Sequence, residues 1–315
     1  MNTPWIKLDY WNTQEDLQRT KQKLFTNNPK DEPEYGKEAS NFLQFSVIGT
    51  FLINCIWFIP SVLYYIIKTL FKKPKSLRNK ICLVTGAGRG LGRELSLELS
   101  RLGAEVICVD IREDINTETV KLIKESGGKA HGYTCNVAKY QEVADLAKTV
   151  QKEVGRVNLL VNNAALIMVH KSGEWPPDEV TSMFNVNVLS HFWAIQAFLP
   201  AMKEENDGHI VSILSTSALN GTPGFSVYGA TKAAGENLLS TLRMELNYNK
   251  NNRIKVTGIY PSVFNSSIDH ASFVNTSIGF MTTEFVANKT IEAILYDKAC
   301  VSIPGTLYYL LQIPK

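Results

Sequence analysis

Apolar and polar positions alternate in blocks along most of this chain, from about residue 79 onwards. Short apolar runs such as KICLVTG, AEVICVD and RIKVTGIYP are continuous, and stretches with helical periodicity separate them. Continuous runs are typical of strands that are buried on both faces of a parallel sheet. The repeated order of strand and helix therefore predicts an α/β fold, a doubly wound parallel sheet with helices on both faces.

The same pattern places the individual elements. Further strands are expected in GKAHGYTCNV, VNLLVNNA, GHIVSIL and KACVSIP. Helices are expected from Leu91, near Thr117 to Lys124, from Val143 to Val154, from Pro177 to Met202, and around Tyr228 as far as Leu246.

A different apolar run, FLQFSVIGTFLINCIWFIPSVLYYII, lies near the N-terminus. No charged residue occurs between Glu38 and Lys68. About 20 apolar residues are enough to cross a bilayer, and this run starts too deep in the chain for an ordinary signal peptide. We expect an N-terminal membrane-anchoring helix here. A buried helix of a soluble core is the alternative.

The charges around this run predict its orientation. Basic residues follow it at Lys68, Lys72, Lys73, Lys75, Arg78 and Lys80. The positive-inside rule then places the main domain in the cytosol. Pro60 leaves two arrangements open, because a proline can kink a spanning helix or turn a hairpin that stays in one leaflet. A hairpin would also permit residence on a lipid droplet.

These patterns divide the chain into segments. We expect a polar N-terminal extension at 1–40, a membrane anchor at 41–71, a basic linker at 72–80, the α/β domain at 81–303 and an apolar tail at 304–315. Within the domain, residues 265–283 lack strong periodicity and carry Phe273, Phe280 and Met281. Long loops are often functional, so we interpret this one as a substrate loop, with a plain surface loop as the alternative.

Composition narrows the function classes. The net charge is only +3, with 33 basic and 30 acidic residues, so a nucleic-acid partner has no support. The five cysteines are scattered and form no C-x-x-C or Cys/His cluster, so we expect neither a metal site nor a disulfide framework. A reducing compartment fits the main domain.

A glycine-rich turn, TGAGRGLG, joins the first expected strand to the first expected helix. Glycines at Gly86, Gly90 and Gly92 would let the backbone approach a pyrophosphate at the helix N-terminus. Asp110 ends the second strand, where a carboxylate can accept hydrogen bonds from ribose hydroxyls and repel a 2′-phosphate. We therefore expect NAD rather than NADP. Arg89 and Arg112 are the counter-evidence, since either could pair with that phosphate.

Tyr228 and Lys232 stand four residues apart in GFSVYGATKAA, so they share one face of a helix. A tyrosine with a pKa of ~10 is a poor base near neutral pH, and a nearby cation favours its phenolate. The pair could therefore exchange a proton with an alcohol or a carbonyl. A pair of surface neighbours is the simpler alternative for this spacing alone.

The combination of motifs resembles the short-chain dehydrogenase/reductase family, whose fold is of the Rossmann type. Thr85 to Gly92 match its glycine motif, and Asn162 to Ala165 match its N-N-A-G segment with alanine in place of the last glycine. The resemblance implies a catalytic set of Asn187, Ser215, Tyr228 and Lys232, in which Ser215 lies thirteen residues before Tyr228. It also implies cofactor-binding residues Gly86, Arg89, Gly90, Leu91, Gly92, Asp110, Asn136, Val137, Asn163, Tyr228, Lys232 and Pro261.

The resemblance implies a role for each catalytic residue. Tyr228 is the acid/base, and Lys232 lowers its pKa and bonds the nicotinamide ribose. Ser215 positions the substrate oxygen, so Ser215 and Tyr228 form the substrate site, with Thr216 or Ser217 as rivals for Ser215. Asn187 holds a water for proton relay, with Asn185 as its rival.

Two histidines near these motifs receive lesser roles. His191 is expected to be a packing residue. His170 follows the N-N-A-A segment and could border the substrate pocket, although this reading is the less favoured one.

A narrower resemblance rests on FNVNVLSHFWAIQAFLPAM together with the N-terminal apolar run. Both are similar to the membrane-associated subgroup of epidermal retinol dehydrogenases and lipid-droplet 17-beta-hydroxysteroid dehydrogenases. This implies a lipophilic substrate such as retinol or a hydroxysteroid, and residence on the endoplasmic reticulum or lipid droplets. The wider family resemblance implies a homodimer through the two long helices that carry Asn187 and Tyr228. Two alternatives stay open: an NADPH-dependent lipid carbonyl reductase, and a non-catalytic membrane or droplet protein on the same scaffold.

Overall fold

The computed structural model describes residues 60–62, 64, 73–264 and 281–305. The polar extension 1–40, most of the expected anchor 41–71, most of the substrate loop 265–283 and the tail beyond Gly305 lie outside these residues. The chain divides into two units, Met1–Lys72 and Lys73–Lys315. None of the helices within the described residues combines the length and the apolar character needed to cross a membrane.

The second unit is built on a seven-stranded sheet in the order β3-β2-β1-β4-β5-β6-β7. All neighbouring strands are parallel. The strands are β1 Ile81–Thr85, β2 Glu105–Asp110, β3 Lys129–Thr134, β4 Leu159–Asn162, β5 His209–Ile213, β6 Lys255–Pro261 and β7 Cys300–Ile303. The predicted doubly wound α/β sheet is therefore confirmed, and every expected strand is present.

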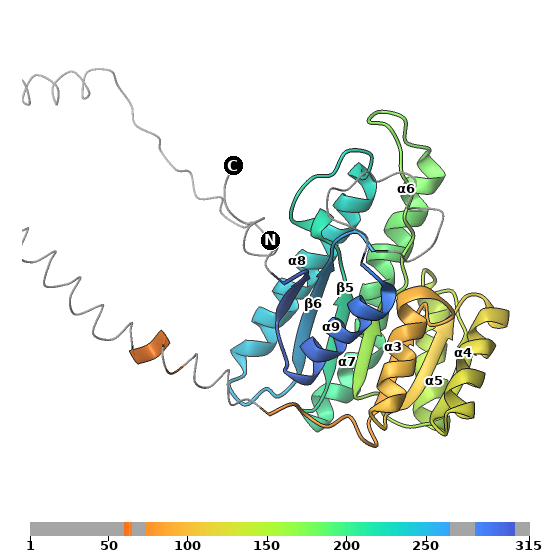
Figure 1. The fold of residues 1–315 in the computed structure, drawn as a ribbon, viewed down its shortest axis with the longest axis vertical. Coiled ribbons are helices and arrows are strands. Elements are labelled where there is room, and N and C mark those ends of the chain that lie inside the picture. The colour runs from red at the N-terminus through yellow and green to blue at the C-terminus, as the bar shows by residue number, and fades with distance from the viewer. Residues whose placement is uncertain (1–59, 63, 65–72, 265–280, 306–315) are drawn as a thin grey trace, which may run out of the picture. The chain divides into compact units, whose positions relative to one another are not determined.

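Helices connect the strands and cover both faces (Figure 1). They are α3 Gly90–Arg101, α4 Glu113–Glu125, α5 Tyr140–Glu153, α6 Pro177–Phe184, α7 Ser190–Glu205, α8 Ser226–Tyr248 and α9 Thr283–Leu295. A π-helical turn, Asn185–Leu189, joins α6 to α7, and a 3₁₀ turn, Thr216–Ala218, precedes α8. The sequence analysis did not single out α9, whose first turn is capped by the Thr282 hydroxyl.

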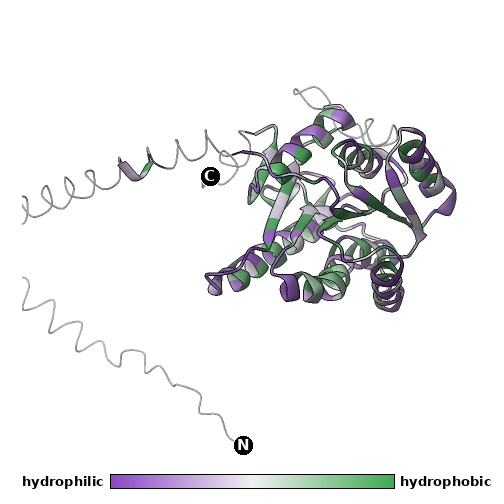
Figure 2. Cartoon of the chain, turned by 90° about the horizontal axis from the view of Figure 1, so that it is seen from below, coloured by the Kyte–Doolittle hydropathy of each residue, from purple (hydrophilic) through white to green (hydrophobic). Residues whose placement is uncertain are grey.

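Two apolar cores lie on the two faces of the sheet. One face packs against α3, α4 and α9, and the other against α5, α7 and α8. Alternate residues of each central strand enter the two cores, as Leu160 and Val161 of β4 do. Figure 2 shows hydrophobic residues along the central strands and mixed polarity on the helices that cover them. Burial on both faces explains why the strands read as continuous apolar runs.

The described part of the basic linker belongs to this domain. Leu77 is 4% exposed and joins the core beneath α3 and α9. The backbone N–H of Lys75 donates to the carbonyl of Leu295 over 2.9 Å, and its ammonium lies 2.8 Å from the Asp297 carboxylate. Residues 73–80 are therefore held against the domain rather than extended from it.

The strand order sets where a ligand can bind. The chain moves outward from β1 to β3 on one side and from β4 to β7 on the other, so the direction reverses between β1 and β4. In open parallel sheets the crevice at the carboxyl ends of the strands beside this point is the ligand site. The predicted site residues fall at that edge.

Candidate active site

The glycine turn after β1 is packed too closely for side chains. Gly86 has φ +66°, and a Cβ there would lie 3.0 Å from the Cα of Ala164. A Cβ on Gly92 would lie 2.0 Å from the carbonyl oxygen of Gly86. The turn can therefore fold back on itself and against the end of β4 only because glycine stands at these positions.

Helix α3 begins in this turn with an open N-terminus. Arg89 is the extended N-cap residue, it makes no side-chain cap, and the first turn contains no acid. The N–H groups and positive dipole end of α3 remain available to an anion. Gly90 has φ +54°, and Leu91 anchors the turn because it is 5% exposed. This end of α3 fits a phosphate group of a dinucleotide.

Asp110 lies at the end of β2 beside the same turn. Its carboxylate accepts hydrogen bonds from the backbone N–H of Gly88 over 2.9 Å and of Arg112 over 3.0 Å. A Cβ on Gly88 would lie 3.0 Å from this carboxylate. The guanidinium of Arg112 pairs with Asp114 over 2.5 Å. The acid is thus fixed beside the glycine turn.

Asn163 ties the glycine turn to β4. Its Nδ2 donates to the carbonyls of Thr85 over 2.9 Å and Gly86 over 3.2 Å. In return, the Thr85 hydroxyl accepts from the backbone N–H groups of Asn163 and Ala164 over 3.0 and 3.1 Å. Thr85 is the first residue of the matched glycine motif, but it was not predicted as a site residue.

Three other predicted cofactor residues follow strands at the same edge. Asn136 forms the turn before α5, where its Oδ1 accepts from the N–H of Ala138 over 3.1 Å. Val137 packs against the core beneath α5 and α7. Pro261 ends β6 and is buried.

Tyr228 and Lys232 lie one turn apart on α8 and both are buried, at 8% and 1% exposure. The ammonium of Lys232 lies 5.6 Å from the centroid of the Tyr228 ring. It donates to the carbonyl of Ile213 at the end of β5 over 2.8 Å. The two groups are therefore neighbours, as their spacing predicted, and one of the lysine's three hydrogens is directed into the sheet.

Burial dominates the titration of this pair. It raises the pKa of Tyr228 to about 12, and the hydrogen bond of the Ser215 side chain opposes that rise. It lowers the pKa of Lys232 to about 7. The four-residue spacing predicted that the lysine lowers the pKa of the tyrosine, whereas in this structure the loss of solvation raises that pKa.

Ser215 lies just after β5 and caps the 3₁₀ turn before α8. Its hydroxyl accepts from the backbone N–H of Ser217 over 3.1 Å, and the residue is 8% exposed. Its side chain reaches Tyr228, because its hydrogen bond is one cause of the pKa of that phenol. Thr216, a rival in the sequence analysis, donates instead to the carbonyl of Pro261 over 3.5 Å.

Asn187 occupies the π-helical turn and is fully buried. Its Nδ2 donates to the carbonyl of Leu166 over 2.8 Å and to the hydroxyl of Thr231 over 3.0 Å. Its Oδ1 accepts from the N–H of Leu166 over 2.7 Å. π-Helical turns are rare and frequently occur at functional sites. Thr231 was not predicted as a site residue, and it contacts Asn187 from a distant position in the chain.

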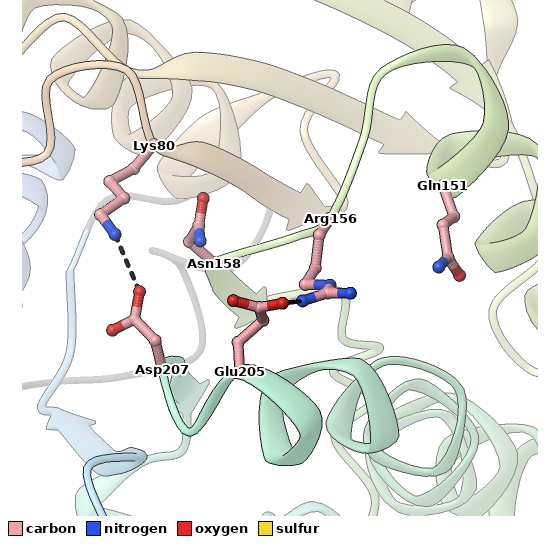
Figure 3. A pocket seen from close by; sticks show the side chains of 6 residues that line it. All are labelled: Lys80, Gln151, Arg156, Asn158, Glu205 and Asp207. Atoms are coloured by element: carbon pink, nitrogen blue, oxygen red, sulfur yellow. Dashed lines mark hydrogen bonds and ion pairs between the residues drawn. The ribbon is translucent and has the colours of Figure 1, made fainter.

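A pocket of about 530 Å³ lies at the opposite edge of the sheet. It is lined by Lys80, Gln151, Arg156, Asn158, Glu205 and Asp207 (Figure 3). Lys80 and Asp207 pair over 2.8 Å, and Arg156 pairs with Glu205, so its charges neutralise one another. The residues that precede β1, β4 and β5 line it, whereas the predicted catalytic residues lie near the carboxyl ends of the strands.

Comparison with known proteins agrees with this arrangement. The sequence pattern of the family described as short chain dehydrogenase matches residues 80–276. The chain belongs to the short-chain dehydrogenase family. It is 35% identical to epidermal retinol dehydrogenase 2 of Mus musculus over 79% of this chain and 82% of the relative. It is 30% identical to estradiol 17-beta-dehydrogenase 11 of Homo sapiens over 82% and 88%.

Solved structures share the fold of this dehydrogenase. One is a short chain dehydrogenase/reductase from Burkholderia phymatum in complex with NAD, with a TM-score of 0.70 and 23% identity over 76% of this chain and 94% of the other. Another is a metagenomic short-chain oxidoreductase in complex with NADP, with a TM-score of 0.63 and 24% identity over 72% and 98%. The family match and the relatives named as dehydrogenases make the protein an oxidoreductase of this family, whose fold binds nicotinamide cofactors.

Proposed function

We propose that this dehydrogenase transfers hydride between NAD and a lipophilic alcohol or carbonyl such as retinol or a hydroxysteroid. The observation that carries the proposal is the meeting of Tyr228, Lys232 and Ser215 at the carboxyl edge of the sheet, the edge that also carries the glycine turn. Relatives named as retinol and estradiol dehydrogenases support the substrate class.

The chemistry of the protein's own residues is proton transfer and positioning. A bound nicotinamide accepts or supplies the hydride. In the oxidation direction Tyr228 takes the hydroxyl proton of the alcohol, and in reduction it returns that proton. The Ser215 hydroxyl donates to the substrate oxygen and stabilises charge that develops there. Lys232 keeps two N–H bonds beyond the one donated to Ile213, and these support the phenolate and the cofactor ribose.

Asp110 supports NAD over NADP. Its carboxylate is held by two backbone N–H groups beside the glycine turn, where it would repel a 2′-phosphate. Arg112 is engaged with Asp114, which weakens it as a phosphate partner. Arg89 is exposed and remains the argument for NADP.

Two loops near Tyr228 form one side of the proposed substrate site. The backbone N–H of His170, in the segment after β4, donates to the carbonyl of Gly224, which precedes α8, over 3.0 Å. The imidazole of His170 also lies 2.8 Å from the Glu179 carboxylate. His170 thereby fixes the segment that would border the substrate.

The proposal includes a membrane location and a dimer. The uncharged run between Glu38 and Lys68, followed by basic residues, supports an anchor in the endoplasmic reticulum or on lipid droplets with the catalytic domain in the cytosol. Exposed apolar side chains on α7 and α8, such as Phe192 and Met244 at 44% and 63% exposure, support a homodimer through these helices.

Product analysis of the full chain with retinol, a 17-hydroxysteroid and a long-chain alcohol, each with NAD and with NADP, tests the function. We expect NAD-dependent oxidation of at least one of them. Faster turnover with NADPH and the matching carbonyls would favour the reductase alternative. Cofactor binding without turnover of any alcohol or carbonyl would favour the non-catalytic alternative.

A further inference from the structure

Three buried polar groups near Lys232 have no hydrogen-bond partner among the described residues. They are Nδ1 of His191, Nδ2 of Asn162 and Oγ of Ser212. The three residues are 1%, 2% and 0% exposed. Leaving a buried polar group unpaired is costly and uncommon in folded proteins, so three of them in one region call for a partner.

Asn162 and Ser212 lie side by side on one face of the sheet. They are register partners at the carboxyl ends of β4 and β5. The register pair two residues earlier, Leu160 and Ile210, enters the core beneath α5, α7 and α8. Because side chains alternate along a strand, Asn162 and Ser212 point to that same side.

His191 approaches this place from the covering helix. Ile195 and Phe198, four and seven residues later on α7, pack into the same core, so His191 shares the sheet-facing side of the helix. It stands at the start of α7, and this end of the helix lies near the carboxyl ends of β4 and β5 because the helix runs back along the strands. A Cβ on Gly235 would lie 4.0 Å from its Nδ1.

Lys232 borders the same place. Its ammonium donates to the carbonyl of Ile213, the residue after Ser212 in β5. Burial, and secondly the charge of Lys232, lower the pKa of His191 to about 3, so the imidazole is neutral at physiological pH. A neutral imidazole has one nitrogen that accepts a hydrogen bond.

We propose that Asn162, Ser212 and His191 form a buried water-binding site behind Lys232, and that His191 is a positioning residue for the Lys232 ammonium. Asn162 Nδ2 can only donate, a neutral His191 can accept, and Ser212 can do both, so one water completes the set. The site is separate from Asn187, whose side chain is already engaged by Leu166 and Thr231.

The positioning role rests on the proposed function of Lys232 as the support of Tyr228. Hydrogen bonds to a charged form favour that form, so the water and His191 oppose the effect of burial on the ammonium. Without them Lys232 would lose its proton more readily and would support the phenolate less. The water site itself does not depend on this function.

The test compares His191→Leu, which removes both ring nitrogens, with His191→Gln, which keeps a hydrogen-bonding side chain. Ser212→Ala is a smaller change at the same site, and Ile195→Leu controls for altered packing one turn along α7. A high-resolution crystal structure of the wild type should contain a water bound to all three residues. A crystal structure without that water overturns the proposed water site.

Carbon-13 NMR of the lysine Cε groups measures the titration of Lys232 directly, so the substrate need not be known. We expect the Lys232 midpoint to fall by about one pH unit in His191→Leu, by less in Ser212→Ala, and to stay at the wild-type value in His191→Gln and Ile195→Leu. Because a less protonated Lys232 supports the Tyr228 phenolate less, the pH profile of kcat/KM should shift to higher pH in these variants, in the same order. An unchanged Lys232 midpoint in His191→Leu, or an equal shift in Ile195→Leu, overturns the positioning role. Shifts of the Lys232 midpoint in this order without any change in the kcat/KM profile would count against the proposed function and leave the positioning of the ammonium intact.

Discussion

Asn187 donates a hydrogen bond from Nδ2 to the hydroxyl of Thr231 over 3.0 Å, and this bond joins the π-helical turn before α7 to helix α8 beside Lys232. The Thr231 hydroxyl in turn donates to the carbonyl of Tyr228 over 2.7 Å. One buried hydroxyl thereby links Asn187 to the turn of α8 that carries Tyr228, the proposed acid/base. The geometry of the site depends on a residue that itself has no part in proton transfer.

Replacing Thr231 by Val should misplace this turn while keeping the volume of the side chain. We expect kcat/KM to fall about 10- to 100-fold, because a displacement of roughly 1 Å at a catalytic group has that effect. The free energy of unfolding should fall by about 1–3 kcal/mol, since Asn187 loses a buried partner. Steady-state kinetics and thermal unfolding measure the two effects.

Thr290→Val is the matched control for Thr231→Val. Thr290 is also fully buried, and its hydroxyl donates to the carbonyl of Val286 over 2.8 Å on α9, on the other face of the sheet. This variant should lose stability and keep its kinetics. Equal kinetic losses in both variants would show that the link between Asn187 and Thr231 has no special role.

Tyr228→Phe should remove the acid/base without changing the shape of the site. We expect kcat to fall at least ~10²- to 10⁴-fold, the usual contribution of a positioned proton donor or acceptor, with cofactor affinity nearly unchanged. Tyr260→Phe is the control, because Tyr260 is fully buried and its hydroxyl bonds Glu236, one turn beyond Lys232. Turnover measurements report the loss of proton transfer, and fluorescence titration with the cofactor reports any change in its binding.

Sequence alone predicted the sheet because the strands are buried on both faces and read as continuous apolar runs. It also predicted the glycine turn and the pair of Tyr228 and Lys232, since both depend on short spacings along the chain. It did not single out α9, and it gave no sign of Thr231 or Thr85 as structural partners of the site. Such contacts join residues far apart in sequence, and only the packed strands and helices bring them together.

The pKa values of the site show a second limit of prediction from the sequence. Spacing along a helix reveals that a cation lies near the phenol, and it carries no information on how completely both groups leave water. Tyr228 and Lys232 are 8% and 1% exposed, and the cost of that burial reverses the direction expected for the tyrosine. Depth in the fold is a tertiary property, so the chain pattern could not supply it.

Asp110→Ser should change the choice of cofactor. Removing the carboxylate eliminates its repulsion of a 2′-phosphate and its hydrogen bonds to ribose, so affinity for NAD should fall about 10- to 100-fold and the ratio of NADP to NAD use should rise. Asp114→Asn, an exposed change that also frees Arg112, is the control. If binding titrations show the same preference in wild type and Asp110→Ser, Asp110 does not select the cofactor.

Lys232→Met should make stability depend less on pH. In the folded wild type the pKa of Lys232 is lowered to about 7, whereas the unfolded chain holds that proton up to the ordinary value of 10.5. Between these values the unfolded state binds more protons, so the unfolding free energy of the wild type rises with pH. Tyr228 is present in both proteins and largely cancels.

The variant lacks the burial cost of the charge, so its stability advantage over the wild type should be largest below pH 7 and shrink toward pH 10.5. The change across this window should be about 3–5 kcal/mol, from about 1.4 kcal/mol for each unit of the pKa shift. Urea unfolding at a series of pH values measures it. Lys148→Met, at a side chain that is 75% exposed, should show no such trend. An advantage of Lys232→Met that is constant with pH would mean that the folded protein keeps the lysine charged throughout.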